Sequence, residues 1–88
     1  MQIVFTPLAF EDYRYWAEHD RKMLKRLNRL IDDCCRALFD GIGKPEPLRN
    51  ELSGFWSRRI DEEHRLVYRI AGEGAGQRLE IVQCRFHY

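Results

Sequence analysis

The sequence has few of the features that mark an exported or membrane-bound protein. It contains only three cysteines, Cys34, Cys35 and Cys84, which fit neither a closed disulfide framework nor a paired zinc site. Its first residues, MQIVFTPLAF, lack a basic segment, an apolar run of signal-peptide length and a small-residue cleavage site. With 33% charged residues, the chain has no apolar run that could span a membrane. We therefore expect a cytoplasmic protein without a membrane segment, in which the cysteines are small buried hydrophobic residues.

The chain also lacks the length for a second hydrophobic core. A protein of 88 residues buries only about 60 to 65% of the surface of its unfolded chain, so residues 1–88 are expected to form a single domain. Its 44% hydrophobic residues are typical of a folded protein and exclude a disordered one. A net charge of +1 does not by itself indicate a nucleic-acid partner. Most of the cations are arginines, however, and the planar guanidinium suits phosphate.

The first half of the chain predicts one strand and two helices. Residues 2–6, QIVFT, are β-branched and aromatic, and Thr6 with Pro7 supplies an N-cap and a first-turn proline. One face of the helix expected over residues 7–19 carries Ala9, Tyr13, Trp16 and Ala17. Asp20 can cap a second helix, which we expect to end near residue 40. The apolar face of that helix consists of Leu24, Leu27, Leu30, Ile31, Cys34 and Leu38.

The second half of the chain predicts a loop and then an antiparallel meander. The loop, GIGKPEPLRN, is rich in glycine and proline, and Pro45 and Pro47 should hold Glu46 in an extended conformation. Period-two alternation predicts three strands, in residues 55–60, 64–70 and 78–88. The whole pattern predicts an α+β fold of order β-α-α-β-β-β. Its two N-terminal helices would pack on a twisted antiparallel sheet of about four strands.

Alternation along these strands is expected to gather polar side chains on one face of the sheet. Leu66 and Tyr68 should meet the helices, so Arg65 faces the other way. A face that gathers Arg65, Arg59 or Arg58, and a terminal His87, beside a loop presenting Glu46, contains an imidazole, a carboxylate and guanidinium groups. These are the parts needed for metal-free RNA cleavage. A base takes the 2′-hydroxyl proton, an acid protonates the leaving 5′-oxygen, and a cation stabilises the phosphorane between them.

The same residues also admit structural interpretations. A histidine at a strand end is often a bystander, strand arginines often pair with carboxylates such as Glu63 or Glu80, and Glu46 could serve as a cap. The segment GEGAG at 72–76 is typical of a hairpin connection, and EEH at 62–64 of a solvated turn. The scattered histidines lack the spacing of a metal site. Residue types and spacing alone leave a catalytic face and a structural one both open.

Longer motifs narrow these alternatives. They occur in a fixed order along the chain: DYRYW at 12–16, GKPEPL at 43–48, LSGFWSRRI at 52–60, EEHRLVY at 62–68 and CRFHY at 84–88. Together they resemble the YoeB toxins of the RelE/ParE superfamily of bacterial toxin-antitoxin systems. The resemblance implies a compact microbial-ribonuclease-like fold and an endoribonuclease that cuts messenger RNA in the ribosomal A site without metal or other cofactor. It also implies a homodimer and an inhibitory antitoxin of the YefM/Phd type.

The resemblance assigns roles to particular residues of this chain. The general base, the phosphate-stabilising cation, the general acid and the terminal aromatic would be Glu46, Arg65, His87 and Tyr88, respectively. Additional phosphate contacts would come from Lys44, Arg49 and Arg59. Two positions depart from the family pattern, since Arg49 stands where a lysine is common and Phe86 where a tyrosine is expected.

Three rival functions remain at this point. A gyrase poison of the ParE type shares the fold but lacks the Glu/Arg/His set, so the combination of Glu46, Arg65 and His87 argues against it. A structural dimer module would use the helical face or the Trp56 face as its interface, but it leaves CRFHY unexplained. A non-catalytic RNA- or protein-binding module would use its arginines only to hold phosphate. That interpretation predicts that His87→Gln leaves every activity unchanged.

Overall fold

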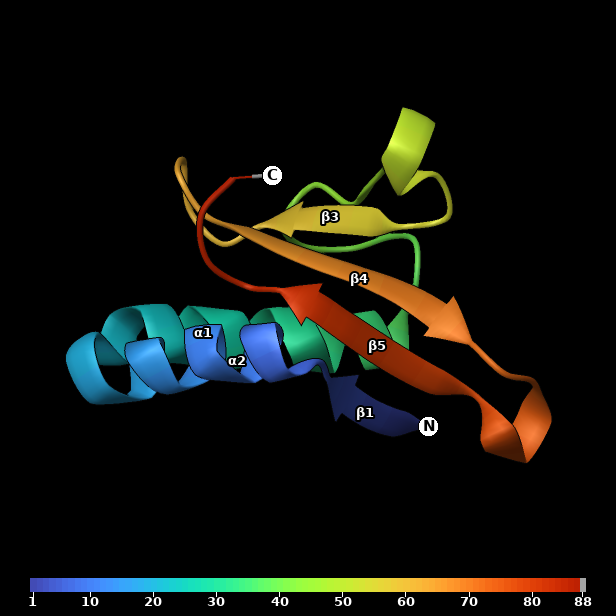
Figure 1. Cartoon of the computed structure of the whole chain (residues 1–88), viewed down its shortest axis with the longest axis horizontal. Helices are drawn as coiled ribbons and strands as arrows, with labels where there is room; N and C mark the ends of the chain where they lie inside the picture. The colour runs from blue at the N-terminus through green and yellow to red at the C-terminus, as the bar shows by residue number, and fades with distance from the viewer. Residues whose placement is uncertain (88) are drawn as a thin grey trace.

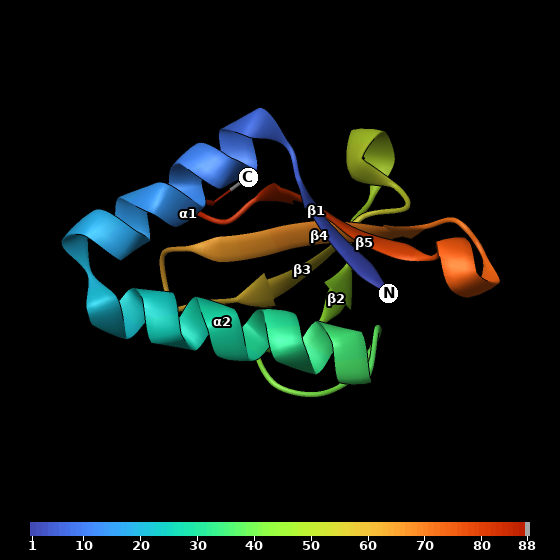
Figure 2. The ribbon, with the colours of Figure 1, turned by 90° about the horizontal axis from the view of Figure 1, so that it is seen from below.

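Two helices pack against a five-stranded sheet, and the elements follow one another in the predicted order (Figure 1). The computed structural model describes residues 1–87. Strand β1 (Gln2–Phe5) precedes helices α1 (Pro7–His19) and α2 (Arg21–Arg36). The later strands are β2 (Glu46–Pro47), β3 (Trp56–Arg59), β4 (Arg65–Ala71) and β5 (Arg78–Gln83), with two short 3-10 helices, η1 (Asn50–Leu52) and η2 (Gly74–Gly76), in the connections. Figure 2 shows the helices as an antiparallel pair running along the length of the molecule.

The sheet confirms the α+β prediction but corrects two of its details. Its strand order is β1-β5-β4-β3-β2, and β1 is parallel to β5 whereas the other neighbours are antiparallel. A parallel pair requires a long crossover, and here the helices and three strands separate the two partners, so no local pattern indicates the pairing. The fifth strand, β2, was predicted as loop because two residues, one of them a proline, show no alternation.

Side-chain caps at the predicted positions begin both helices. Thr6 Oγ1 accepts a hydrogen bond from the amide of Ala9 at 3.2 Å, and Asp20 Oδ1 accepts one from the amide of Met23 at 3.2 Å. Helix α2 ends at Arg36, earlier than predicted, since the carbonyls that follow it accept hydrogen bonds from side chains of the sheet. Within residues 1–87, neither helix has the length and apolar character needed to cross a membrane.

The core lies between the helices and the sheet. Its fully buried members come from both layers: Ala9, Leu27, Leu30, Cys34, Leu66, Tyr68, Leu79, Ile81 and Cys84. Leu66 and Tyr68 thus face the helices as predicted. Ala17 does not, because Asp12 and Trp16 take the inward positions of α1.

The cysteines follow the prediction at two positions of three. Cys34 and Cys84 are fully buried, and desolvation raises the pKa of the Cys34 thiol to about 11. Desolvation raises the pKa of Cys84 still further. Cys35 is exposed, because the next position along α2 turns away from the core.

Arg58 is a core residue, so of the two arginines offered as alternatives for the polar face, Arg59 or Arg58, it is Arg59 that lies there. Its side chain is 0% exposed. The guanidinium donates to Asp33 Oδ2 at 2.6 Å and to the hydroxyl of Tyr68 at 3.2 Å. It also donates to three carbonyls beyond α2, those of Ala37, Asp40 and Ile42. One side chain of β3 therefore holds the end of α2 and the loop that follows it.

Replacing Arg58 by methionine should destabilise the protein by about 3 to 5 kcal/mol, because Asp33 and the buried acceptors lose their donor. Urea unfolding at neutral pH measures this loss. The control is Arg59→Met, in which an exposed neighbour changes identically and the expected change is within about 0.5 kcal/mol. Similar losses in the two variants would show that the buried network adds nothing.

Asp33 should make stability depend on acid. Hydrogen bonds from the Ile42 amide, Arg36 and Arg58 lower its pKa to about 2, below the value of about 3.9 in an unfolded chain. The folded state therefore binds the proton more weakly, and the stabilisation that is complete above about pH 4 is lost as the pH falls toward 2. The free energy of unfolding should fall less steeply over this interval in Asp33→Asn than in the wild type. Parallel profiles would contradict this assignment.

Candidate active site

Two of the predicted arginines and the predicted base share the face of the sheet that is turned away from α2. The register pairs Glu46 of β2 with Ser57 of β3, and Arg59 of β3 with Arg65 of β4. Since Arg58 points toward α2, its neighbours Ser57 and Arg59 point the other way. Glu46 and Arg65, which pair with Ser57 and Arg59, point to the same side of the sheet as their partners. The alternation predicted along β3 and β4 is therefore confirmed, whereas the last strand ends at Gln83 and not at residue 88, so alternation does not place His87 on this face.

Glu46 is fixed by its backbone and presented to solvent by its side chain. The β2–β3 pairing is extended on both sides, by hydrogen bonds from Arg59 N–H to Gly43 O at 2.6 Å and from Leu48 N–H to Phe55 O at 2.9 Å. Pro45 and Pro47 flank Glu46 and restrict the backbone. The extended conformation predicted for this stretch is confirmed, because Glu46 lies in strand β2. A carboxylate on a pinned backbone can reach substrate without ordering a loop first.

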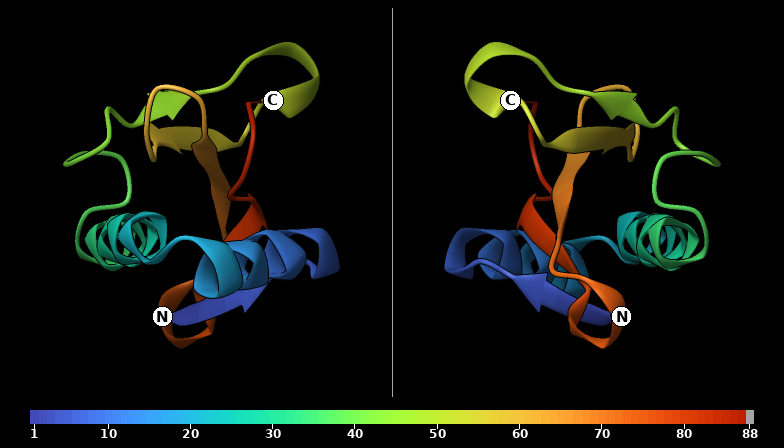
Figure 3. Two further views of the ribbon diagram at one scale, coloured as in Figure 1. Left: turned by 90° about the vertical axis from the view of Figure 1, so that its left-hand side faces the viewer. Right: turned by 90° about the vertical axis from the view of Figure 1, so that its right-hand side faces the viewer.

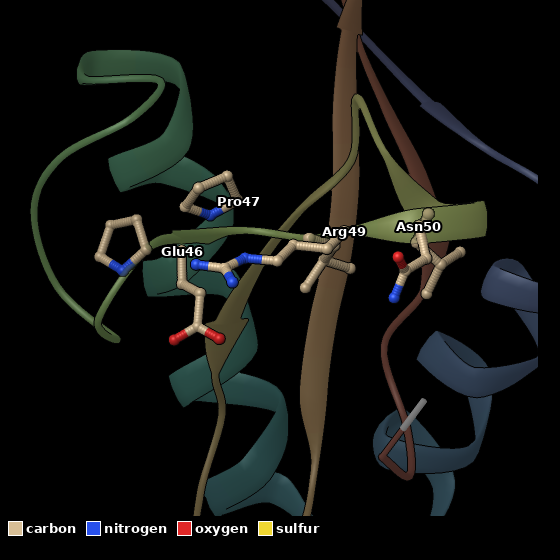
Figure 4. A pocket seen from close by; sticks show the side chains of 7 residues that line it. Glu46, Pro47, Arg49 and Asn50 are labelled. Atoms are coloured by element: carbon tan, nitrogen blue, oxygen red, sulfur yellow. The ribbon is translucent and has the colours of Figure 1, made fainter.

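The carboxylate of Glu46 lies at a surface pocket of about 680 Å³ (Figure 4). The lining consists of Pro45, Glu46, Pro47, Leu48, Arg49, Asn50 and Leu52. In Figure 4 the guanidinium of Arg49 extends along the pocket toward Glu46. Lys44 is exposed just before the pocket, with a left-handed φ of 53°. The pocket thus combines a carboxylate with a guanidinium, and a further cation, Lys44, directly precedes its first lining residue in the chain.

Arg65 is held by the turn that precedes it. Asp61 Oδ1 accepts hydrogen bonds from the amides of Glu63 and His64 at 2.8 and 2.7 Å, which closes the β3–β4 turn. Arg65 Nη1 donates to the carbonyls of Asp61, Glu62 and His64 at 2.8, 3.2 and 3.1 Å. The side chain is largely buried, and these three hydrogen bonds are all donated by Nη1. A guanidinium held in this way is oriented before substrate arrives.

The segment after β5, residues 84–87, turns back across the sheet and passes beside Arg65. Figure 3 shows this segment on the opposite side of β3 and β4 from α2. The carbonyl of Phe86 accepts a hydrogen bond from the amide of Arg65 at 2.9 Å, and the amide of Phe86 donates one to His64 Nδ1 at 2.7 Å. His87 follows directly and is exposed. Tyr88, the predicted terminal aromatic, lies outside the described residues.

Helix α1 holds the same segment from its other side. Trp16 Nε1 donates to the carbonyl of Cys84 at 2.8 Å, and the amide of Cys84 donates to Asp12 Oδ2 at 3.1 Å. Desolvation raises the pKa of Asp12, and the hydrogen bond from Cys84 opposes that rise. The guanidinium of Arg85 stacks on the ring of Tyr15, 3.4 Å from its centroid. The DYRYW motif therefore anchors the end of the chain as well as packing in the core.

His64 is a residue whose part in the site the sequence did not reveal. The EEH segment was predicted to be a solvated turn, and Glu62 and Glu63 are indeed exposed. The side chain of His64 is only 12% exposed, and its ring meets Trp16 edge to face at a centroid distance of 4.8 Å. The available signal was its place directly before Arg65 in the EEHRLVY motif.

The site can supply a carboxylate, an imidazole and several guanidinium groups. Glu46 and Arg49 line the pocket and Lys44 directly precedes it in the chain, while Arg65, His64 and the Phe86 backbone meet at the start of β4. Across residues 1–87, no group of three or more histidine, cysteine, aspartate or glutamate side chains is arranged to hold a metal ion.

Comparison with known proteins identifies the family. Residues 5–88 match the model for the YoeB-like toxin of the bacterial type II toxin-antitoxin system. The chain belongs to this family. Over 88 residues it is 57% identical to Toxin YoeB of Streptomyces coelicolor, covering 100% of both chains. The YoeB family resemblance of the motifs is thereby confirmed, and the chain is a toxin of a type II toxin-antitoxin system.

Solved structures of YoeB proteins share the fold throughout. The YoeB/ParE toxin from Agrobacterium tumefaciens superposes with a TM-score of 0.96 at 50% identity, with 100% of both chains covered. YoeB from Staphylococcus aureus has been solved as a dimer and in a heterotetrameric complex with YefM. Each of these two matches has a TM-score of 0.88 at 44% identity and covers 100% of this chain and 98% of the other.

Proposed function

We propose that this YoeB-family toxin is a ribosome-dependent endoribonuclease that cleaves messenger RNA in the A site by metal-free acid-base catalysis. The main support is that Glu46 and Arg65 lie on the side of the sheet turned away from α2, where the Arg65 amide is bonded to the carbonyl of Phe86, the residue directly before His87. Glu46 stands in an open pocket, and Arg65 is oriented by its turn. Acid, base and cation thus come from three separate segments of the chain.

In the proposed reaction, Glu46 accepts the proton of the 2′-hydroxyl as its oxygen attacks the adjacent phosphorus. Arg65 stabilises the charge of the phosphorane, and His87 gives a proton to the departing 5′-oxygen. The products are a 2′,3′-cyclic phosphate and a free 5′-hydroxyl. Each positioned proton transfer contributes about 10²- to 10⁴-fold in rate. Lys44, Arg49 and Arg59 are exposed around this site and would hold neighbouring phosphates.

The ribosome would supply the positioning that the toxin lacks. A carboxylate is a weak base at neutral pH, so much of the rate must come from placing the 2′-hydroxyl and phosphate in line. Among the described residues, the lining of the pocket beside Glu46 comes from one short segment, within residues 45–52, and its other side is open. A messenger held in the A site would close this open side and bring its scissile phosphate to Arg65.

The partners of the toxin follow from its relatives. Staphylococcus aureus YoeB forms a dimer and a heterotetrameric complex with YefM. We infer that this chain also forms a homodimer and is inhibited by an antitoxin of the YefM/Phd type. Its place of action would be the cytoplasm, where ribosomes and messenger meet.

Cleavage of a defined messenger in a reconstituted translation system tests this function. Primer extension should detect a cut at the A-site codon with the wild type. Glu46→Gln and His87→Gln should each slow it by about 10²- to 10⁴-fold, because each removes one proton transfer. Glu73→Gln, in the exposed β4–β5 connection, is the matched control and should cut at the wild-type rate.

Two outcomes would contradict the proposal. Folded wild type that leaves ribosome-bound messenger intact would favour a gyrase poison, which a DNA supercoiling assay would detect. Folded Glu46→Gln and His87→Gln variants that cut as fast as the wild type would instead assign the cleavage to other groups.

A further inference from the structure

His64 joins the turn before Arg65 to the end of the chain. Its ring lies between two aromatic neighbours, with centroids 4.8 Å from Trp16 and 5.9 Å from Phe86. Because the side chain is only 12% exposed, this packing fixes the plane of the imidazole. The position of Nδ1 is therefore set by the core and not by solvent.

Two consecutive residues hold the peptide groups of Phe86 from both sides. His64 Nδ1 accepts from the Phe86 amide at 2.7 Å, and the Arg65 amide donates to the Phe86 carbonyl at 2.9 Å. Phe86 has a φ of 66°, a left-handed conformation that side chains other than glycine seldom adopt. Such a conformation persists where the surroundings over-determine it, and these two hydrogen bonds do so.

We infer that His64 is a positioning residue, which fixes the direction in which the chain leaves Phe86 and so sets His87 relative to Arg65. The structural part stands on the hydrogen bond, the packing and the backbone conformation. The catalytic consequence rests on the proposed function, in which His87 is the general acid. Packing against Trp16 is enough to explain why the ring of His64 is buried. The inference therefore concerns the hydrogen bond that Nδ1 accepts from the Phe86 amide.

The inference also assigns the tautomer of His64. An imidazole accepts a hydrogen bond at Nδ1 only when its proton is on Nε2. Nε2 lies 3.6 Å from Glu63 Oε1, so the nitrogen that carries the proton faces a carboxylate. This arrangement favours the tautomer that the Phe86 amide requires.

Two substitutions separate the acceptor from the ring. His64→Phe keeps an aromatic ring against Trp16 but has no acceptor, whereas His64→Asn places Oδ1 close to the position of Nδ1. His64→Gln is a second variant without an acceptor there, since its oxygen falls near the position of Nε2. Glu62→Gln is the matched control, because it changes an exposed side chain of the same turn and leaves Nδ1 and the contact between Nε2 and Glu63 in place.

The first readout is amide hydrogen exchange in the free ¹⁵N-labelled toxin, which does not depend on catalysis. The Phe86 amide should be protected in the wild type, His64→Asn and Glu62→Gln. It should exchange about tenfold faster in His64→Phe and His64→Gln, the change expected for one lost hydrogen bond. Equal protection in all variants would overturn the inference. Should His64→Phe fail to fold, His64→Gln alone decides this comparison.

The second readout is single-turnover cleavage of ribosome-bound messenger. His64→Phe and His64→Gln should lower the maximal rate by about 10²-fold without shifting the toxin concentration at half-saturation, because the acid is misplaced and binding is retained. His64→Asn should restore most of the rate. Loss of rate in His64→Asn equal to that in His64→Phe would overturn the positioning role. A wild type that does not cleave would contradict the proposed function, and amide exchange would still decide the structural part.

Discussion

The buried guanidinium of Arg58 connects α2, the loop that follows it and the sheet in this small protein. It reaches Asp33 within α2, the Tyr68 hydroxyl on β4 and the carbonyls that follow α2. Tyr68 in turn donates to the carbonyl of Leu38 at 2.9 Å. A chain of this size has little apolar area to spare, so a fully paired charge in its core is acceptable only because every neighbour supplies an acceptor.

The place of Glu46 depends on this network. The loop held by Arg58 leads directly to Gly43, whose carbonyl accepts the Arg59 amide and starts the pairing of β2 with β3. Gly43 has a φ of 82°, and a Cβ there would come within 2.7 Å of Leu30 Cδ2. Only glycine fits this approach. The carboxylate proposed as the base is thus presented by a backbone that is fastened to the core a few residues earlier.

The sequence indicates much of the fold because its local signals agree with one another. Capping residues, helical stripes and strand alternation predict both α-helices and the β3–β5 meander. The parallel pairing of β1 depends on contacts across nearly the whole chain, and β2 is too short to show a period. Alternation indicates which face Arg58 occupies, but its burial depends on carbonyls left at the end of α2, which no pattern in β3 reveals.

The site is less visible in the sequence than the fold. Residue types and spacing suggested a polar face with Glu46 beside it, and the motifs of the family assigned the roles. His64 was missed because its partner is the backbone of Phe86, and a main-chain donor leaves no trace in residue types. A charged turn such as EEH is usually solvated. Here the ring of His64 is largely buried because it packs against Trp16 and Phe86.

A messenger that lacks one 2′-hydroxyl tests the central claim most directly. Ribosomes would be programmed with two messengers that differ only in a single 2′-deoxynucleotide on the 5′ side of the A-site scissile bond. The proposed mechanism predicts that the toxin cuts the all-ribose messenger and leaves a 2′,3′-cyclic phosphate, while the deoxy-substituted messenger stays intact. Equal cleavage of both messengers would show that the 2′-hydroxyl is not the nucleophile, and the acid-base mechanism proposed for Glu46 and His87 would be wrong.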